Sequence, residues 1–314
     1  MKTHLSTTIN EDHRIVTNNS KLQQLQYDIA KVGFSPKKVV QTILTGSHKS
    51  KLRGRGMDFE EVRNYAKGDD VRNIDWKVTG RTDELHSKVF TEERERPVFI
   101  ITDQCSSMFL GTKEYLKSVI AVESAALIAW KVLAVGDRIG GLIYNDTNKF
   151  TLPPRKNKSH VLTMIDQLTD FNHALLNSKV LKPNDNTLGE IIFEIKKRIT
   201  HDYLVVWISD FNQYRSSHTK DLVALSEHND VILVQVSDPL ETNFNPQQIT
   251  FSNGDDQFQF ERSSEKRVKR VTNHFKEKQN QLEALSTNYP ITLLKLSTES
   301  SATHQFKEIL RKSR

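Results

Sequence analysis

The chain has 314 residues, a formal net charge of +6 and a single cysteine. At about 150 residues per domain, this length suggests one large domain or two modest ones. A hydrophobic fraction of 36% is enough for a core and argues against wholesale disorder, and a lone Cys105 excludes both an intramolecular disulfide and a zinc site built from cysteines.

Features of the sequence that bear on location favour the cytoplasm. One cysteine suits a reducing compartment. No run reaches the ~18 consecutive apolar residues of a membrane helix; the longest, over 119–135, contains Glu123 and Lys131 and reads as a buried helix. The first residues contain no apolar stretch of the signal-peptide type. We therefore expect a cytoplasmic protein without a membrane span.

The charge is distributed unevenly along the chain. Residues 1–96 carry 18 basic and 14 acidic side chains, residues 97–261 carry 15 and 20, and residues 262–314 carry 12 and 5. A dispersed basic excess argues only weakly for nucleic-acid binding. The acidic middle of the chain is the natural place for a cation site.

The first 96 residues differ in character from the rest. Apolar residues at helical spacing predict an amphipathic helix over 21–32, and a second short helix is predicted over 34–48. Residues 49–96 are too polar for a core and too rich in aromatic residues for a linker. We therefore expect two domains, an N-terminal helical and extended segment over 1–96 and an α/β domain over 97–314.

From residue 98 onward, short apolar runs alternate with helical patterns. The predicted strands are 98–102, 139–144, 204–209, 231–236 and 291–296. The predicted helices lie near 113–135, 158–169, 188–200, 217–228, 263–287 and 302–312. Strands this apolar are buried on both faces, so the pattern predicts a doubly wound α/β fold with a mostly parallel sheet. Residues 150–152 suit an antiparallel edge strand, and residues 241–261 an irregular excursion or a hairpin.

Ligands of such folds bind at the carboxyl ends of the strands, where this chain places carboxylates and hydroxyls. Asp103 ends the first strand and is followed by Cys105 and Ser107; Asp210 follows the strand 204–209, and Thr187 precedes a helix. Oxygen ligands of this kind suit Mg²⁺. The alternative is that these residues only cap helices and form turns.

The pattern Asp103-x-Cys105-x-Ser107, then Thr187, then Asp210, resembles the metal-ion-dependent adhesion site of von Willebrand factor A domains. In that family the motif is Asp-x-Ser-x-Ser, followed by a Thr and an Asp. The resemblance implies that Asp103, Ser107, Thr187 and Asp210 surround a metal ion, whose shell is completed by a carboxylate of the partner.

A second resemblance comes from the residues before the first strand, over 45–50, 54–59 and 63–76. Its most specific string is Gly68-Asp69-Asp70-x-Arg72-x-Ile74-Asp75-Trp76. This signature resembles the bacterial domain of unknown function 58 family, whose members resemble von Willebrand A domains and are typically encoded beside MoxR-type AAA+ ATPases. The resemblance covers about residues 40–240. It implies a von Willebrand A-like fold and a MoxR-type ATPase, or its client protein, as partner.

One position departs from the adhesion-site motif. Cys105 stands where the family has the first Ser, and a thiol is a softer ligand than Mg²⁺ prefers. The metal site is therefore weakened, completed by water in place of the side chain, or vestigial. Mg²⁺ is a possible cofactor on this evidence, and Cys105 is the reason for doubt.

The charged segment before the first strand has two interpretations, a partner-docking surface or a scaffold. The residues concerned are Arg63, Asp69, Asp70, Arg72, Asp75 and Trp76. Arginines in this set can form bidentate pairs with carboxylates. We favour the scaffold, in which Trp76 anchors the segment and the Arg–Asp pairs staple it to the α/β body.

The leading functional hypothesis is a non-enzymatic protein-interaction module that acts as an adaptor for a MoxR-type ATPase. The alternative is a Mg²⁺-dependent hydrolase at Asp103 and Asp210, for which the sequence offers no evident base or nucleophile beyond Cys105. A third hypothesis, nucleic-acid binding through the basic residues over 262–287, is weaker because aromatic residues do not interleave with the basic ones. No G-x-x-x-x-G-K-[ST] motif occurs, so the chain is not itself a P-loop ATPase.

Overall fold

The computed structural model describes residues 12–31, 57–92, 97–177, 187–242, 250–252, 257–259 and 265–312. The short helix predicted over 34–48 and the signature residues 45–56 lie outside this described part. The chain divides into two compact units. One is Gly46–Glu95, and the other combines Met1–Thr45 with Arg96–Arg314.

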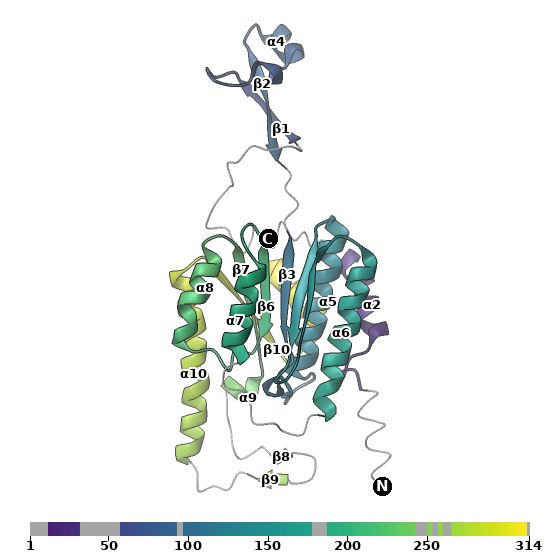
Figure 1. Cartoon of the computed structure of the whole chain (residues 1–314), viewed down its shortest axis with the longest axis vertical. Helices are drawn as coiled ribbons and strands as arrows, with labels where there is room; N and C mark the ends of the chain where they lie inside the picture. Colours follow the sequence, from purple (N-terminus) through teal and green to yellow (C-terminus); the bar gives the residue numbers. More distant parts are fainter. Residues whose placement is uncertain are drawn as a thin grey trace. The chain divides into compact units, whose positions relative to one another are not determined.

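The larger unit is built on a six-stranded sheet (Figure 1). Its strands are β3 (Val98–Asp103), β4 (Ile139–Tyr144), β5 (Lys149–Arg155), β6 (Leu204–Ser209), β7 (Asp230–Ser237) and β10 (Ile291–Ser297). They lie in the order β10-β7-β6-β3-β4-β5, and every neighbouring pair is parallel except the antiparallel β4–β5. This is the doubly wound order, with the first strand at the centre, and it confirms both the predicted fold class and the antiparallel edge strand.

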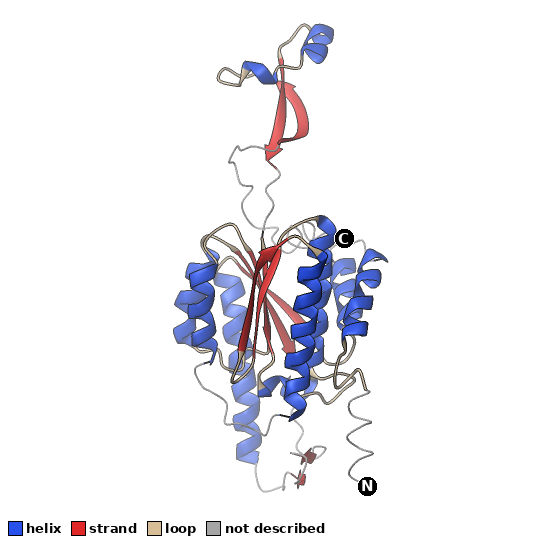
Figure 2. Cartoon of the chain, turned by 45° about the vertical axis from the view of Figure 1, so that its right-hand side comes forward, coloured by secondary structure: helices blue, strands red, loops and turns tan. Residues whose placement is uncertain are grey.

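Helices cover both faces of the sheet, as Figures 1 and 2 show. They are α2 (Asn19–Lys31), α5 (Lys117–Val135), α6 (Lys158–Asn177), α7 (Thr187–Arg198), α8 (Thr219–Ser226), α10 (Glu265–Asn288) and α11 (Ala302–Lys312). In Figure 1, α2, α5 and α6 lie on one side of the sheet and α7, α8 and α10 on the other. Shorter elements are the 3-10 helix Ser106–Met108, α9 (Pro239–Thr242) and the hairpin of β8 (Thr250–Ser252) and β9 (Gln257–Gln259).

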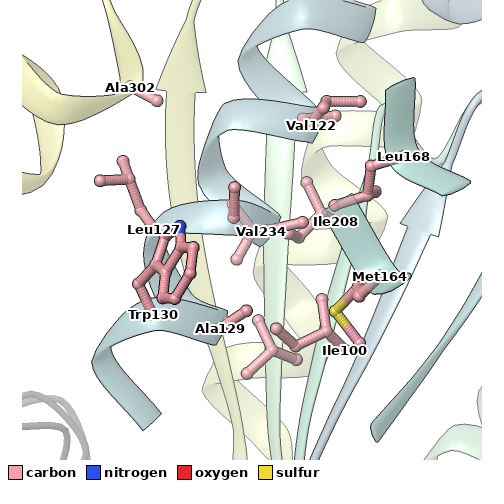
Figure 3. Packing of buried hydrophobic residues seen from close by; sticks show 14 of the residues in the cluster. Ile100, Val122, Leu127, Ala129, Trp130, Met164, Leu168, Ile208, Val234 and Ala302 are labelled. Carbon is pink, nitrogen blue, oxygen red and sulfur yellow. The ribbon is translucent and has the colours of Figure 1, made fainter. Parts of the chain in front are cut away.

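Successive strand residues point to opposite faces and so fill two cores. Ile100, Ile208 and Val234 pack toward α5 and α6, as Figure 3 shows. Their neighbours in the sequence, among them Phe99 and Trp207, belong to the core on the opposite face. All six residues of β3, β4 and β6 are buried, which explains why the strands read as nearly continuous apolar runs.

The most apolar helix, α5, is a core helix of this unit. The helix is long and apolar enough to cross a membrane, but 72% of its most apolar 18-residue stretch is buried inside the protein. Glu123 on this helix is buried and pairs with Lys21 of α2 at 2.6 Å. The described part of the chain therefore contains no clear membrane span, and the cytoplasmic location stays a prediction.

The first described helix belongs with the α/β unit. Leu22 and Leu25 of α2 are 0% and 5% exposed, and the indole nitrogen of Trp130 on α5 donates to the carbonyl of Leu22 at 2.9 Å. Our expected division at residue 96 grouped this helix with the charged segment. Tertiary packing places it on α5 instead, because its apolar stripe needs a partner to cover it.

The β5 edge of the sheet carries two prolines. Pro153 and Pro154 lie in this antiparallel strand, and the carbonyl of Pro153 accepts a hydrogen bond from Nε2 of His160 on α6 at 2.7 Å. Proline cannot donate to a ladder and is tolerated in sheets at edges. The sequence therefore supports the position of β5 at the edge.

The smaller unit is described by itself. β1 (Met57–Asn64) and β2 (His86–Glu92) form an antiparallel pair, and between them lie the 3-10 helix Val71–Asn73 and α4 (Trp76–Thr82). Ile74 is 9% exposed and bridges to Ser87 of β2. The segment that the sequence marked only as charged therefore has regular structure of its own.

Docking of α2 is expected to contribute substantially to stability. Leu22→Ala should lower the free energy of unfolding by about 2–5 kcal/mol, because it leaves a cavity beneath a fully buried side chain. Urea unfolding of the full chain measures this loss. The exposed Gln24→Ala on the same helix is the control and should change the value by less than about 0.5 kcal/mol; equal effects would show that α2 is not docked.

Candidate functional site

The structure brings two predicted carboxylates together at the carboxyl edge of the sheet. Asp103 ends β3 and Asp210 follows β6, and these strands are neighbours with Thr102 beside Ile208. The hydroxyl of Ser209 donates to Oδ2 of Asp103 at 2.6 Å. Both carboxylates are buried, at 5% and 8% exposure. The topology thus places them where ligands of doubly wound folds bind.

The loop after β3 folds back onto these carboxylates. The backbone N–H of Cys105 donates to Oδ1 of Asp103 at 2.8 Å, and Ser107 is one of the groups that lower the pKa of Asp210. The Cys105 side chain is 2% exposed. Burial, reinforced by the charge of Asp103, raises the pKa of this thiol far above its usual range. Cys105 is therefore a neutral thiol and neither a hard ligand nor a nucleophile.

A buried lysine that the sequence analysis did not single out occupies the site. Nζ of Lys117, in the first turn of α5, lies 2.8 Å from Oδ2 of Asp210 and 2.6 Å from Oε1 of Glu241. The Lys117 side chain is 0% exposed, and those of its two partners are 3% and 7% exposed. The three residues, which we call the ammonium cluster, form a buried ion triad.

The ion pairs of Lys117 set the direction of the pKa shifts of Lys117 and Asp210. Burial favours the neutral form of Lys117, but Asp210 and Glu241 outweigh it and raise the pKa of the ammonium. Burial would likewise raise the pKa of Asp210, but the charge of Lys117 holds it below its usual value. Among the residues that the structure describes, no cationic side chain pairs with Asp103, and burial together with the charge of Asp210 raises its pKa to about 6. Lys117 is therefore charged at neutral pH.

A second carboxylate network fixes the loops around the cluster. Asp238, after β7, is 0% exposed and accepts from the hydroxyl of Thr112 and from the hydroxyl of Thr298, each at 2.5 Å. It also accepts the backbone N–H of Thr112 at 2.8 Å. Asp238 donates its own N–H to Oε2 of Glu241 at 3.0 Å. The two networks are thus joined.

Thr187 begins α7 and is 5% exposed. The backbone N–H of the next residue, Leu188, donates to Oε1 of Gln213 at 3.2 Å. Gln213 follows Asp210 by three positions. The start of α7 therefore lies at the same edge of the sheet as the other predicted ligands.

The residues at this edge do not fit a Mg²⁺ ion of the expected kind. Oδ2 of Asp210 is taken by Lys117 and by Nδ2 of Asn212, and its Oδ1 by the N–H of Asn212. Mg²⁺ wants an octahedral set of oxygens, and here an ammonium and a neutral thiol stand among them.

In the smaller unit, the predicted charged residues interact mainly within the segment. Arg63 pairs with Asp69 at 2.8 Å. Asp70 accepts the N–H of Arg72 at 3.0 Å and so caps the short 3-10 helix. Asp75 caps α4 by accepting the N–H groups of its first turn at 3.0 and 3.1 Å. These aspartates therefore serve as local caps.

The expected anchoring role of Trp76 is not seen in this unit. The side chain is 70% exposed, and Val71 beside it is 62% exposed, whereas Ile74 is buried. Trp76 is the first residue of α4, and Ile74 forms the bridge to Ser87 of β2. The choice between scaffold and docking surface stays open.

Sequence reasoning missed Lys117, Glu241 and Asp238. One signal was available for Lys117, because it is a charged residue at the start of the most apolar of the predicted helices. The end of a helix is usually assumed to be exposed to solvent, so a lysine there is not expected to be buried. Glu241 and Asp238 lie 124 and 126 positions from their partners Lys117 and Thr112. Residues that far apart in the sequence are brought into contact by the order of the strands in the sheet, which the sequence alone does not give.

The exposure of Trp76 leads to a prediction for the smaller unit. Trp76→Ala should change its stability by less than about 0.5 kcal/mol, whereas Ile74→Ala should cost about 2–4 kcal/mol. Hydrogen–deuterium exchange of the β1 and β2 amides in the full chain reports on both. Equal loss of protection in the two variants would show that Trp76 is an anchor after all.

Asp238 should stabilise the protein only in its charged form. Burial opposes ionisation, but hydrogen bonds from Thr112 and Thr298 lower the pKa of Asp238 below its ordinary value of 3.8. Its contribution is therefore present above pH 3.8 and lost as the pH falls through the lower, folded-state pKa.

Asp238→Asn should cost about 1–3 kcal/mol at pH 7, and this difference from wild type should shrink below pH 3.8. Urea unfolding at several pH values measures it. Asp221→Asn, which breaks only an exposed pair with Lys196, is the control and should cost less than about 1 kcal/mol. A pH-independent Asp238→Asn effect would disprove the ionic role.

Curated proteins similar to this chain include the uncharacterised proteins Rv1480 of Mycobacterium tuberculosis and Mb1516 of Mycobacterium bovis. Each is 29% identical over 203 residues, which is 65% of this chain and 62% of the relative. The chain thus matches less than two thirds of the length of these relatives.

Two solved structures share part of the architecture. BatB from Bacteroides thetaiotaomicron is 14% identical, with a TM-score of 0.38 over 69% of this chain and 98% of BatB. The SpRpn10 VWA domain is 9% identical, with a TM-score of 0.36 over 70% of this chain and 95% of that domain. At these scores the fold assignment rests on the strand order of the chain itself.

The model of one protein family covers residues 61–281, from the smaller unit through most of the α/β unit. This match extends over more than half of the chain, and it agrees with the Gly-Asp-Asp-x-Arg-x-Ile-Asp-Trp string in the sequence. The chain belongs to the DUF58 family of proteins of unknown function.

Proposed function

We propose that this protein is a non-enzymatic interaction module that acts as an adaptor for a MoxR-type AAA+ ATPase. The carboxyl edge of the sheet is its docking face, and the ATPase supplies mechanical work on a client protein. Family membership and the doubly wound fold support an interaction role. The choice of a MoxR-type ATPase rests on the family resemblance read from the sequence.

One observation carries the choice of docking face. Phe109 follows the 3-10 helix Ser106–Met108 at the carboxyl edge and is 44% exposed, although Met108 beside it is 0% exposed. Aromatic side chains, Phe among them, are enriched at protein–protein interfaces. Phe109 lies where folds of this class bind their ligands.

The loop that carries Phe109 is held in place from several sides. The N–H of Lys117 donates to the carbonyl of Leu110 at 2.8 Å, and the N–H of Tyr115 donates to the carbonyl of Thr298 at 3.1 Å. Asp238 binds Thr112 in the same loop. A loop fixed in this way loses little conformational entropy on binding, which favours affinity.

The alternative hypotheses find less support. A hydrolase at Asp103 and Asp210 would need a metal, an activated nucleophile or a base. At this edge Asp210 is paired with Lys117, and Cys105 is a buried neutral thiol. Nucleic-acid binding through the basic residues over 262–287 is weaker because aromatic residues do not interleave with the basic ones.

The docking face can be tested with purified components. Phe109→Ala should weaken binding to a MoxR-type ATPase from the same genome at least tenfold, because the side chain would be buried at the interface. Isothermal titration calorimetry in the presence of ATP measures the Kd. The variant should keep the wild-type Tm, since Phe109 is exposed.

The matched control is Phe193→Ala. Phe193 is 63% exposed in the middle of α7 and lies away from the carboxyl edge, with Lys197 over its ring at 4.1 Å. It should leave the Kd unchanged. Equal effects of the two variants would exclude the carboxyl edge as the docking face, and absence of wild-type binding would exclude the ATPase as partner.

A further inference from the structure

The ammonium of Lys117 has the position and the contacts of a bound cation. It is wholly buried and touches carboxylate oxygens from two different loops, Oδ2 of Asp210 after β6 and Oε1 of Glu241 in α9. A lysine is seldom this buried unless its charge is paired. These partners come from elements far apart in the sequence, as the ligands of a structural metal ion commonly do.

Both carboxylate oxygens of Asp103 accept hydrogen bonds from protein donors. Oδ1 of Asp103 accepts the N–H of Cys105, and Oδ2 accepts the hydroxyl of Ser209. The start of α5 adds the partial positive charge of a helix N-terminus at Lys117 itself. Lys117 and the helix N-terminus thereby offset part of the negative charge at this edge.

A carboxylate oxygen close to Ser106 lacks a hydrogen-bond partner among the described residues. Oδ1 of Asp146, in the loop after β4, is buried without a hydrogen bond, while its Oδ2 accepts the N–H of Ser106 at 2.7 Å. A single carboxylate oxygen does not make the octahedral set of Mg²⁺. If a metal ion binds at this edge, Oδ1 of Asp146 is the free ligand that we expect it to use, and such binding would contradict our interpretation.

We propose that Lys117 is a built-in cation that replaces the divalent ion of this edge, so that the site is assembled without metal. Lys117 links α5, the end of β6 and α9, as a metal ion would. Cys105 is tolerated in the motif because no ion needs a hydroxyl there. The inference concerns the assembly of the site, and only its binding test rests on the proposed function.

The first experiment measures thermal unfolding of the full chain in EDTA and in millimolar MgCl₂, MnCl₂ or CaCl₂. The Tm should agree within about 1 °C in all four conditions, because no ion binds the folded state selectively. A saturable rise of several degrees that is lost in Asp210→Asn would overturn the proposal. A rise lost instead in Asp146→Asn would do the same and would locate the metal at that carboxylate.

The second experiment removes the built-in charge. Lys117→Met should lower the Tm on the order of 10 °C, because two carboxylates remain buried without their counter-ion. Lys131→Met on the same helix is the matched control and should lower it far less, since Lys131 is only partly buried. Equal losses in the two variants would overturn the proposal.

A compensated variant guards against failure to fold. Lys117→Met combined with Asp210→Asn and Glu241→Gln removes the cation and both of its charges, and should recover at least half of the lost Tm. Recovery would show that the loss was electrostatic. A triple variant no more stable than Lys117→Met would show that Lys117 acts by packing alone and would contradict the proposal.

The third experiment asks whether the vacated position accepts an ion. Lys117→Ala leaves Asp210 and Glu241 facing a small cavity, and MnCl₂ or MgCl₂ should now raise the Tm of this variant but not that of wild type. Stabilisation of neither protein would show that the position is not equivalent to a cation site.

The proposed function enters only in the last test. The Kd of the wild-type protein for the ATPase is measured with and without EDTA, with the ATPase in a nucleotide state that needs no metal. The Kd should be the same in both conditions. A Kd that changes on addition of EDTA would contradict docking without a metal ion. If the ATPase does not bind at all, the proposed function fails, but the three Tm experiments still decide the role of Lys117.

Discussion

A lysine ammonium shared by two buried carboxylates is the constraint on which the carboxyl edge depends. Transfer of a charged group out of water costs several kcal/mol, and only close, well-aligned partners repay it. Lys117 meets this condition with oxygens at 2.8 and 2.6 Å. The positions of α5, of the residue after β6 and of α9 are therefore set together, because movement of any one would strand a buried charge.

The sheet topology makes this contact possible. β3 and β6 are central neighbours, and the connections from their carboxyl ends lead to helices on opposite faces. At that switch point the loop after β3 and the residues after β6 diverge. From the first turn of α5, Lys117 contacts Asp210 after β6 and Glu241 in α9. Asp238 ties the loop before α5 to the end of β10.

The helices and strands were predictable because burial of one face or of both faces gives their apolar residues a regular spacing in the sequence. β4, β6 and the other central strands read as apolar runs, and the helices as 3.6-residue stripes. Boundaries were less accurate; α5 begins at Lys117 rather than near 113, because Lys117 donates its N–H to the carbonyl of Leu110 and the chain turns there. α6 continues to Asn177, beyond the predicted end at 169.

The site was predictable in part. Asp103 and Asp210 could be placed together from strand ends alone, and the structure places them so. The ammonium cluster could not be foreseen, since periodicity says which residues are buried but not which charges they meet. Within the smaller unit Trp76 is exposed and Ile74 is buried, so the anchoring role expected of Trp76 stays a prediction.

The two prolines of β5 affect how the protein can associate. An open sheet edge offers unpaired backbone groups to any extended chain, and this is a common route to aggregation. At β5, Pro153 and Pro154 have no N–H to offer, and the carbonyl of Pro153 is already bonded to His160. At β10, Lys295 is an exposed charge on the opposite edge strand. Strand addition is therefore disfavoured at both edges, which leaves loops and helices as the surfaces for recognition and protects the chain against fibril-like self-association.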